Sequence, residues 1–242
     1  FVAATYQHRR DRDGLAHPGP LTSLGTMNAF LASRISYGLD LHGPSETIDS
    51  LCSSSLVALS RAVDALTLEH CTEAIVAGVN VGLTDWYFDS LTAMGALGTL
   101  HSTPFDASAN GFIPGEGAVT LRVKKLSAAR RDGDQVFAII RGCAVSHGGR
   151  GSSLTVPRSV EQAAVIRKAL GNAGVTCDDV TLVEAHGTAT HLGDPIEVAA
   201  LREVFDSPAG TPCSLGTVKA NIGHLEPAAG LAGIVKVLLA MR

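Results

Sequence analysis

The sequence predicts an α/β protein whose sheets are covered by helices. Two observations predict this class: short apolar runs typical of buried strands alternate with segments of helical periodicity, and glycine-rich stretches separate them. Of the 242 residues, 45% are hydrophobic and 17% are charged, against a usual charged share of about 25%. Such a chain has ample apolar material for a large core and is not disordered.

The elements follow one another without a repeat or a linker long enough to separate two domains. Apolar runs predict strands over 74–83, 118–123, 136–145 and 180–185. Apolar positions at helical spacing predict helices over 53–68, 160–173, 195–205 and 228–241. Pro195 suits the first turn of its helix, and Lys236 marks the only wet side of the strongly apolar last helix. Glycine-rich loops lie over 108–117, 147–151, 186–193 and 216–224, where such folds place their chemistry.

Composition and charge argue against several classes of function. A net charge of −4 disfavours nucleic-acid binding, which needs a basic face, and no apolar run is long enough to predict a membrane span. The five cysteines are an odd number without a C-x-x-C pair, so we expect no metal site, no disulfide framework and a cytoplasmic location. The chain opens on Phe1 without a leader pattern, so we expect no signal peptide and a start cut from a longer protein.

The first candidate for chemistry is Cys52, in the string DSLCSSSL. A helix is predicted to begin close to it, with Asp49 and Ser50 as N-caps. A cysteine at a helix start faces unpaired backbone N–H groups and the positive end of the dipole, which favour the thiolate. The alternative is a small buried hydrophobe, which is the usual fate of a free cysteine and our interpretation of the other four.

Two histidine-bearing loops are the other candidates. A predicted strand runs straight into His186, followed by a small-residue loop, which presents an imidazole at the lip of a sheet for acid–base or oxyanion chemistry. Further on, a loop between apolar segments contains polar residues at 219, 221, 224 and 226. Burying these side chains would be costly without a hydrogen-bond network that satisfies them. The alternatives are a core histidine satisfied by a carbonyl and a solvated turn.

Several well-known catalytic and nucleotide-binding motifs are absent from the sequence. The strings G-x-S-x-G, H-E-x-x-H, G-x-G-x-x-G and G-x-x-x-x-G-K-[ST] do not occur. The glycines of 110–117 therefore predict tight turns and not a phosphate cradle. Asp106 and Glu116 could be paired carboxylates, but their turn settings favour solvated or turn-capping roles.

One cysteine at a helix start followed by two loop histidines is much more specific than any single motif. With the strings GPS, DSLCSSSL, PFDASANGFIPGEG, EAHGTATHLGDPIE and KANIGHLEPAAG in this order, the chain resembles the ketosynthase domain of a type I modular polyketide synthase. This domain belongs to the β-ketoacyl synthase and thiolase-like superfamily. The resemblance covers essentially all of 1–242.

The resemblance implies a thiolase-like fold, layered α/β/α/β/α, made of two related halves. The chain resembles the central part of a single ketosynthase domain. Its first half is expected over about 1–145 and its second half over about 146–242. The fold is expected to be incomplete at both ends, with opening strands before Phe1 and closing strands, including a Gly-Phe-Gly-Gly turn, after Arg242.

Carried over residue by residue, Cys52 resembles the nucleophile that takes an acyl chain as a thioester from phosphopantetheine. A malonyl-type extender then loses carbon dioxide, and the enolate attacks the Cys52 thioester. His186 and His224 match the histidines that stabilise the enolate oxygen, and such donors can supply several kcal/mol each. We expect both imidazoles to lie within roughly 8 Å of the sulfur.

Four residues match supporting positions of the family. Lys219 resembles the lysine that holds the histidine network together, and Glu226 matches its neighbouring acid. Thr188 and Thr190 match loop threonines that hydrogen-bond the pantetheine arm.

Three places depart from the family pattern. Ser50 and Leu51 stand where Thr-Ala is commoner, which puts the acyl preference in doubt because the bulky Leu51 adjoins the acyl pocket. Ala189 replaces the second glycine of Gly-Thr-Gly-Thr, and costs about 1 kcal/mol if the position needs a positive φ. Asn110 and Pro114 look more like synthases served by a separate acyltransferase.

The resemblance implies an acyltransferase of polyketide chain elongation, a β-ketoacyl–acyl carrier protein synthase. It implies no tightly bound cofactor and no metal, because phosphopantetheine arrives on the acyl carrier protein. The other expected partners are further polyketide synthase domains and a second copy in a homodimer. The alternatives are a fatty-acid-type synthase and a non-condensing, acyl-binding gatekeeper, whose members usually lose a site residue that this chain retains. A degradative thiolase and a Cys-His hydrolase fit less well.

Overall fold

The computed structural model describes residues 1–5, 19, 21–206 and 212–242. The chain divides into two compact units. Unit 1 comprises 1–95, 114–137 and 224–235, and unit 2 comprises 96–113, 138–223 and 236–242. The division into two related halves, over about 1–145 and 146–242, remains a prediction.

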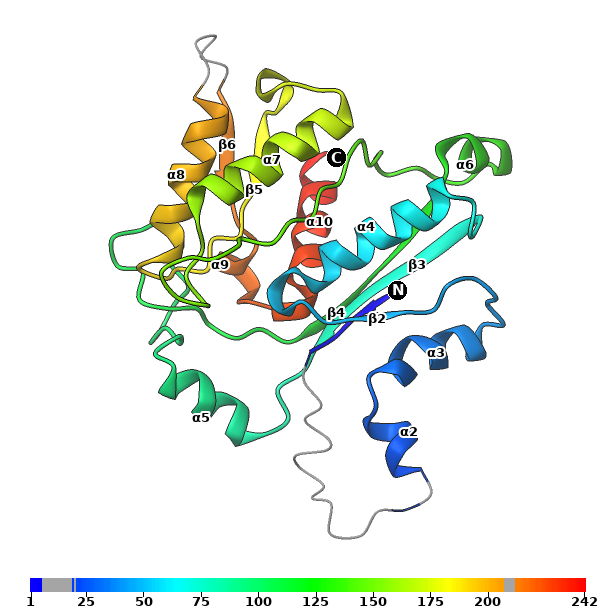
Figure 1. The fold of residues 1–242 in the computed structure, drawn as a ribbon, viewed down its shortest axis with the longest axis horizontal. Helices are drawn as coiled ribbons and strands as arrows, with labels where there is room; N and C mark the ends of the chain where they lie inside the picture. The colour runs from blue at the N-terminus through cyan, green and yellow to red at the C-terminus, as the bar shows by residue number, and fades with distance from the viewer. Residues whose placement is uncertain (6–18, 20, 207–211) are drawn as a thin grey trace. The chain divides into compact units, whose positions relative to one another are not determined.

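Unit 1 is built on a four-stranded mixed sheet in the order β2-β1-β3-β4 (Figure 1). β1 (Val2–Ala3) pairs in parallel with β2 (Thr47–Ile48) and with β3 (Glu73–Asn80). β3 pairs antiparallel with β4 (Gly117–Lys124) along its whole length. The strands predicted over 74–83 and 118–123 are confirmed, although the first ends at Asn80.

The helices of unit 1 begin with α4 (Ser54–Thr67), which follows a 3₁₀ turn, η1 (Leu51–Ser53), and packs on β3. α4 confirms the helix predicted over 53–68. Unit 1 also contains α2 (Thr22–Thr26), α3 (Ala29–Gly38), α5 (Asp85–Ala93), α6 (Leu126–Asp132) and a second 3₁₀ turn, η3 (Glu226–Ala228).

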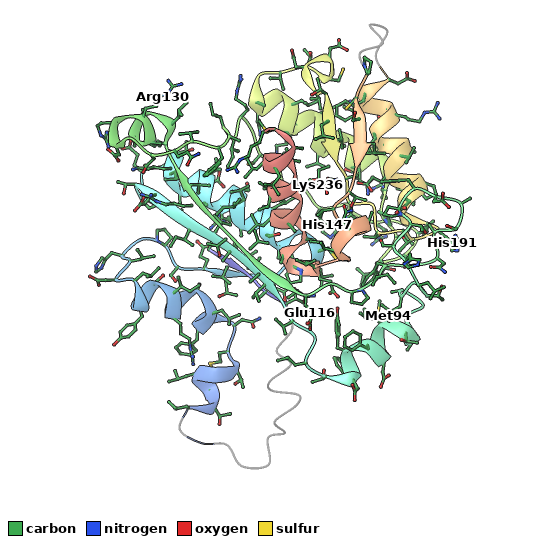
Figure 2. All side chains as sticks on the ribbon, turned by 180° about the vertical axis from the view of Figure 1, so that it is seen from behind. Met94, Glu116, Arg130, His147, His191 and Lys236 are labelled. Carbon is green, nitrogen blue, oxygen red and sulfur yellow. The ribbon has the colours of Figure 1, made fainter. Side chains whose placement is uncertain are left out.

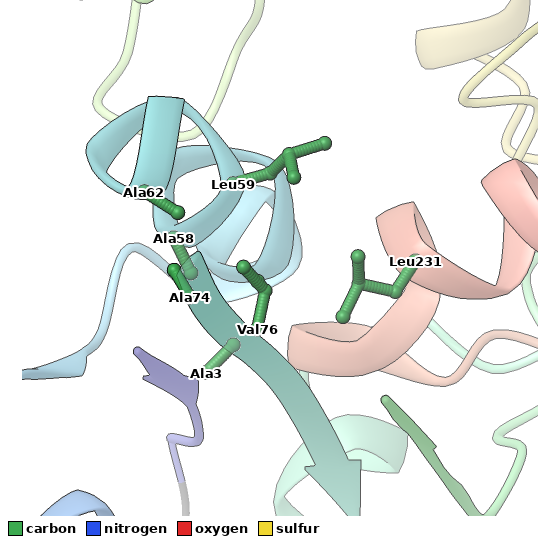
Figure 3. Close-up of a cluster of buried hydrophobic side chains, with 7 residues drawn as sticks. All are labelled: Ala3, Ala58, Leu59, Ala62, Ala74, Val76 and Leu231. Atoms are coloured by element: carbon green, nitrogen blue, oxygen red, sulfur yellow. The ribbon is translucent and has the colours of Figure 1, made fainter. Parts of the chain in front are cut away.

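The core of unit 1 is made mainly of small side chains that join α4, β3 and the start of α10 (Figure 3). Its buried members are Ala3, Ala58, Leu59, Ala62, Ala74, Val76 and Leu231. Ala58 and Ala62 are fully buried, and their small size lets α4 lie close to the strand. Full burial of Val76 and of Leu231 stabilises the fold by about 1.5–3 kcal/mol each.

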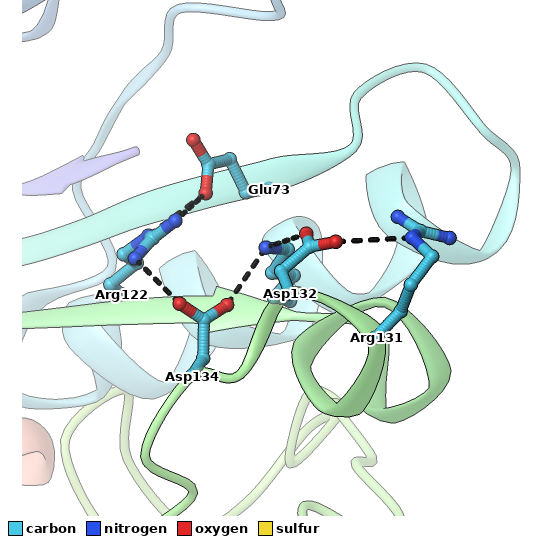
Figure 4. A network of polar contacts seen from close by, with 6 residues as sticks. Glu73, Arg122, Arg131, Asp132 and Asp134 are labelled. Atoms are coloured by element: carbon cyan, nitrogen blue, oxygen red, sulfur yellow. Dashed lines mark hydrogen bonds and ion pairs between the residues drawn. The ribbon is translucent and has the colours of Figure 1, made fainter.

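A chain of ion pairs fixes α6 and the turn after it to the β3–β4 pair (Figure 4). Arg122 contacts Glu73 and, at 3.5 Å, Asp134, while Lys124 contacts Asp132 and, at 2.8 Å, Asp134. Hydrogen bonds from Lys124 lower the pKa of both aspartates. A cavity of about 710 Å³ lies beside this network and is lined by none of the predicted site residues.

Unit 2 pairs two short strands in parallel, β5 (Leu182–Glu184) and β6 (Ser214–Gly216). Its longer helices, α7 (Ser159–Ala173) and α8 (Gly193–Phe205), pack together around Ala163, Ala200 and Val204. These helices confirm the predictions for 160–173 and 195–205, whereas the strand predicted over 180–185 is shorter. This unit also contains a 3₁₀ turn, η2 (Cys177–Asp179), and a four-residue helix, α9 (Lys219–Ile222).

The strand predicted over 136–145 is wrong. No strand of the described residues pairs with this segment, and several of its apolar side chains, including Phe137 and Ile139, are exposed. The segment is instead tethered to the end of α7: Arg141 donates to the Ala173 carbonyl at 3.2 Å, and Asn172 donates to the Cys143 carbonyl at 2.8 Å. An apolar run predicts burial, but a strand also needs a hydrogen-bonded neighbour, which local sequence does not encode.

α10 (Ala229–Ala240) confirms the helix predicted over 228–241. Lys236, labelled in Figure 2, was expected to mark its wet side. It instead pairs with Glu184 at 2.7 Å, and its side chain is only 32% exposed. The ion pair with the half-buried Glu184 carboxylate keeps the Lys236 side chain against the protein. In the part of the chain that the structure describes, no helix is both long and apolar enough to cross a membrane.

Candidate active site

Cys52 lies in a tight turn between β2 and α4. Leu51, just before it, has a φ of 55°, in the left-handed region that costs a non-glycine residue about 1–2 kcal/mol. Ser54 closes the turn, because its hydroxyl accepts from the Ser50 N–H at 2.8 Å and donates to the Leu51 carbonyl at 2.6 Å. The prediction that Asp49 and Ser50 cap α4 is wrong, since η1 intervenes and Asp49 accepts from the Leu51 N–H at 3.2 Å.

His224 brings an imidazole to the sulfur of Cys52. Its Nε2 lies 3.0 Å from Cys52 Sγ, although the two residues are 172 positions apart. The His224 carbonyl accepts from the Gly115 N–H at 2.9 Å, and the residue forms a parallel β-bridge with Pro114, so its backbone is fixed. The predicted approach of His224 to Cys52 is confirmed, and the histidine is buried while the cysteine is half-buried.

The backbone decides which nitrogen of the neutral His224 ring carries the proton. The N–H of Glu226 donates to His224 Nδ1 at 3.1 Å, so Nδ1 keeps its lone pair and Nε2 is protonated. The Nε2–H group is therefore the one at the Cys52 sulfur. A donor in this position stabilises a thiolate, and it also stabilises negative charge that develops on a substrate oxygen there.

Two glycines allow the His224 loop to come this close. A Cβ on Gly78 of β3 would lie 3.0 Å from the Ala228 Cα of η3, and a Cβ on Gly230 would collide with the Leu56 side chain at the start of α4. Only hydrogen at these positions leaves room for η3 and α10 against the strand and the helix. The distance between the sulfur and the imidazole depends on this packing.

Glu226 links the His224 loop to a residue without a predicted role. Its φ is 41°, and its buried carboxylate accepts a hydrogen bond from the hydroxyl of Tyr87 in α5. Tyr87 is only 1% exposed. No motif surrounds this tyrosine in the sequence, so local pattern gave no reason to single it out.

In unit 2, His186 follows β5 almost directly, as predicted. Glu197 of α8 fixes this corner, since its carboxylate accepts from the His186 N–H at 2.6 Å and from the Gly187 N–H at 2.8 Å. Burial raises the pKa of Glu197, and these two hydrogen bonds oppose the rise. Glu197 stands in the quoted EAHGTATHLGDPIE string, yet it carried no predicted role.

The electrostatic setting keeps His186 neutral. Desolvation and the positive charge of Lys219 lower the pKa of His186 from 6.5 to about 4. Water at the exposed part of the residue screens this shift without reversing it, so the imidazole is uncharged at pH 7 and has one N–H to donate. Thr217 joins the two residues, because its hydroxyl donates to the His186 carbonyl at 3.5 Å and accepts from the Lys219 N–H at 3.3 Å.

Glu184 anchors the loop that carries Lys219. One carboxylate oxygen accepts from the Val218 N–H at 2.5 Å, and the other pairs with Lys236 at 2.7 Å. Lys219 is 5% exposed, so a buried cation lies in the electrostatic neighbourhood of His186. The supporting role expected for Lys219 stays a prediction.

In the loop after His186, Ala189 has the positive φ expected at a position where the family pattern has a glycine. Ala189 is fully buried with a φ of 59°, so the position does need a positive φ. The hydroxyls of Thr188 and Thr190 lie 3.3 Å apart, and Thr190 also accepts from the Gly193 N–H at 3.2 Å where α8 begins. These contacts close the loop, and the expected role of both threonines toward pantetheine stays a prediction.

The two carboxylates considered for acid–base chemistry have the roles predicted for them. Asp106 caps its own turn by accepting from the Ser108 N–H at 2.8 Å. Glu116 is exposed, as predicted for a solvated residue, and accepts from the Gly82 N–H at 2.6 Å, 34 positions away.

The structure thus joins Cys52 with His224 in unit 1 and His186 with Lys219 in unit 2. The convergence of His186 on Cys52 stays a prediction. Cys52 lies in a strained turn at a helix start and has a buried imidazole donor at its sulfur. This arrangement suits an enzyme whose cysteine nucleophile forms a thioester.

Comparison with known families identifies this class more closely. Residues 2–129 match the β-ketoacyl synthase N-terminal domain, and residues 137–242 match the β-ketoacyl synthase C-terminal domain. The chain therefore belongs to the β-ketoacyl synthase family.

The curated relatives are polyketide synthases. The chain is 46% identical over 230 residues to polyketide synthase ThaG of Burkholderia thailandensis, which covers 93% of this chain and 4% of that protein. It is 47% identical over 220 residues to polyketide synthase PksN of Bacillus subtilis, which covers 87% of this chain and 4% of that protein. The chain therefore spans a small part of these relatives.

Solved ketosynthases share the fold. The oxazolomycin ketosynthase domain of Streptomyces albus has a TM-score of 0.90 at 37% identity, covering 98% of this chain and 42% of that one. The ketosynthase from module 6 of the bacillaene synthase of Bacillus subtilis has a TM-score of 0.87 at 40% identity, covering 90% and 39%. The predicted thiolase-like α/β fold and the resemblance to polyketide synthase ketosynthases are confirmed.

Proposed function

We propose that this chain contributes the condensing centre of a polyketide synthase, which joins an acyl group on Cys52 to a malonyl-type extender. The observation that carries the proposal is the 3.0 Å contact between Cys52 Sγ and His224 Nε2, with Nδ1 of the same ring held by the Glu226 N–H. This contact supplies a nucleophile and a fixed hydrogen-bond donor in one place.

The first step is a thioester exchange. The Cys52 thiolate attacks the carbonyl carbon of an acyl thioester, a new C–S bond forms, and the C–S bond to the phosphopantetheine arm breaks. The proton of the Cys52 thiol ends on the departing pantetheine thiol. The Nε2–H of His224 favours this step because it stabilises the thiolate before the attack.

The second step forms and uses an enolate. The bond from the extender to its carboxylate breaks, carbon dioxide leaves, and the electron pair moves into an enolate whose oxygen accepts hydrogen bonds from neutral His224 and His186. The enolate carbon then attacks the Cys52 thioester, so that a C–C bond forms and the thiolate leaves. The loss of one such donor in other enzymes costs about 10²–10³ in rate.

The partners follow from this chemistry. The proposal needs an acyl carrier protein, whose phosphopantetheine arm delivers both thioesters, and no tightly bound cofactor on this chain. The membership of the curated relatives in polyketide synthases supports further synthase domains as neighbours. A homodimer and a cytoplasmic location are proposed with them.

The experiment compares two histidine variants of the full-length protein that carries this chain. His224→Ala should lower the decarboxylation of a malonyl thioester by about 10²–10³-fold. His70→Ala, at an exposed position three residues after the end of α4, is the matched control and should leave the rate unchanged. Rates within threefold of each other for the two variants would contradict the proposal, and acylation of Cys52 without any decarboxylation would indicate a gatekeeper.

A further inference from the structure

Tyr87 is a buried residue that the mechanism above does not use. Its side chain is 1% exposed, and its hydroxyl donates to the carboxylate of Glu226, a residue 139 positions further along the chain. The start of α5 fixes the tyrosine: its N–H donates to the Thr84 carbonyl at 3.2 Å, and its carbonyl accepts from the Ser90 hydroxyl at 2.8 Å. The Phe88 ring packs edge-on against it, with ring centroids 4.8 Å apart. The phenol is therefore a fixed donor.

Glu226 contributes to the site through its backbone. Its N–H donates to His224 Nδ1 at 3.1 Å, and this N–H has the right direction while the φ of Glu226 is 41°. A non-glycine residue leaves this left-handed region readily unless its surroundings hold it there. The hydrogen bond from Tyr87 to the carboxylate is one such restraint, and it acts on the same residue.

We propose that Tyr87 is a positioning residue for the condensing reaction, which acts through Glu226 on the tautomer of His224. The inference rests on the proposed function. The Tyr87 hydroxyl holds the Glu226 carboxylate, the carboxylate holds the strained backbone, and the backbone N–H keeps the proton of His224 off Nδ1. Nε2 is thereby kept as a donor toward Cys52.

Loss of the Tyr87 hydroxyl has a defined chemical consequence. Once Glu226 relaxes, its N–H no longer occupies His224 Nδ1, and the neutral ring can carry its proton there instead. Nε2 then presents a lone pair to the sulfur and no longer donates. The thiolate loses a stabilising hydrogen bond, so the Cys52 thiol titrates at higher pH, and the enolate oxygen loses a donor.

The test uses Tyr87→Phe in the full-length protein, with Tyr37→Phe as the matched control because Tyr37 is 91% exposed. The first measurement is the rate of Cys52 alkylation by iodoacetamide against pH. The second is the decarboxylation of a malonyl thioester. Tyr87→Phe should move the midpoint of alkylation upward by about one pH unit and slow decarboxylation at least tenfold, as expected for a lost hydrogen bond to a charged group. Tyr37→Phe should change neither.

A double-mutant cycle separates positioning from a general loss of structure. Glycine adopts a φ of 41° without strain, so in a Glu226→Gly background the backbone no longer needs Tyr87. There, Tyr87→Phe should change both measurements by less than threefold. This comparison also stands if Tyr87→Phe alone fails to fold, because Glu226→Gly removes the buried carboxylate to which Tyr87 donates.

Two results would overturn the proposal. One is an unchanged alkylation midpoint in Tyr87→Phe, with or without a loss of melting temperature. The other is an equal effect of Tyr87→Phe in both backgrounds. Alkylation requires no condensation, so failure of the proposed function is seen separately. A protein that shows the Tyr87-dependent midpoint but never decarboxylates the extender would contradict the condensing role and leave the positioning contact intact.

Discussion

Replacement of Gly78 by alanine tests whether the packing of η3 on β3 sets the geometry of the Cys52–His224 pair. The added Cβ would lie 3.0 Å from the Ala228 Cα and 3.3 Å from its Cβ, whereas carbon atoms pack at about 3.5–4.0 Å. Ala228 is fully buried, so η3 must move away from the strand by a few tenths of an ångström. Overpacking of this kind costs about 1–3 kcal/mol of unfolding free energy.

The same movement displaces the imidazole, because His224 lies just before η3. A misplacement of about 1 Å in a reacting geometry costs roughly 10²-fold in rate. Because η3 moves by only a few tenths of this distance, we expect Gly78→Ala to slow malonyl-thioester decarboxylation severalfold, up to about tenfold. We also expect the melting temperature to fall by about 2–4 °C for each kcal/mol. Both quantities are measured on the full-length protein.

Gly171→Ala is the matched control for this experiment. A Cβ at that position in α7 meets no heavy atom within 4 Å, and alanine is favoured over glycine in a helix by about 1 kcal/mol. The control should keep its rate and gain a little stability. A Gly78→Ala protein with an unchanged rate, with or without a loss of stability, would refute the reasoning.

Three further predictions concern the cysteine, the second histidine and the Glu184 clamp. Cys52→Ala should abolish acylation by a thioester substrate, whereas Cys177→Ala should not; acyl mass that persists in the first variant would show another acceptor. Because desolvation and Lys219 hold the pKa of His186 at about 4, below its value of 6.5 in the unfolded chain, the unfolded state takes up the proton first. His186 therefore contributes stability that is complete above pH 6.5 and is lost as the pH falls toward 4, and His186→Gln should flatten the unfolding free energy in that window. Glu184→Gln should lower the unfolding free energy by about 1–3 kcal/mol, because it leaves the half-buried Lys236 ammonium without its charged partner. Calorimetry of the variant tests this prediction, and an unchanged melting temperature would contradict it.

The part of the site that the sequence could predict is the part written in local strings. The helix start at Cys52 and the strand that ends before His186 are consequences of neighbouring residues, and the order of the three motifs carried the resemblance. The positive φ of Ala189 was likewise foreseeable, because a glycine is expected at that position in the family.

The rest of the site depends on contacts that no string in the sequence marks. Tyr87 hydrogen-bonds to Glu226 and Glu197 accepts from the His186 N–H, and neither residue has a spacing that marks it. Leu51 takes a left-handed φ against the preference of its residue type, since the Ser54 hydroxyl and the Asp49 carboxylate hold the turn. The strand predicted over 136–145 is wrong for a related reason. Its apolar pattern predicts a buried strand but does not specify the neighbouring strand with which it would pair.

The most direct test of the condensing role follows the acyl group on Cys52 itself. The full-length protein is first loaded with an acyl thioester, and intact-mass spectrometry records the acyl adduct before and after malonyl–acyl carrier protein is added. The condensing mechanism predicts that the adduct disappears while carbon dioxide is released and the carrier gains the acyl group as a β-ketoacyl thioester. An adduct on Cys52 that persists while the malonyl–carrier protein remains intact would contradict it.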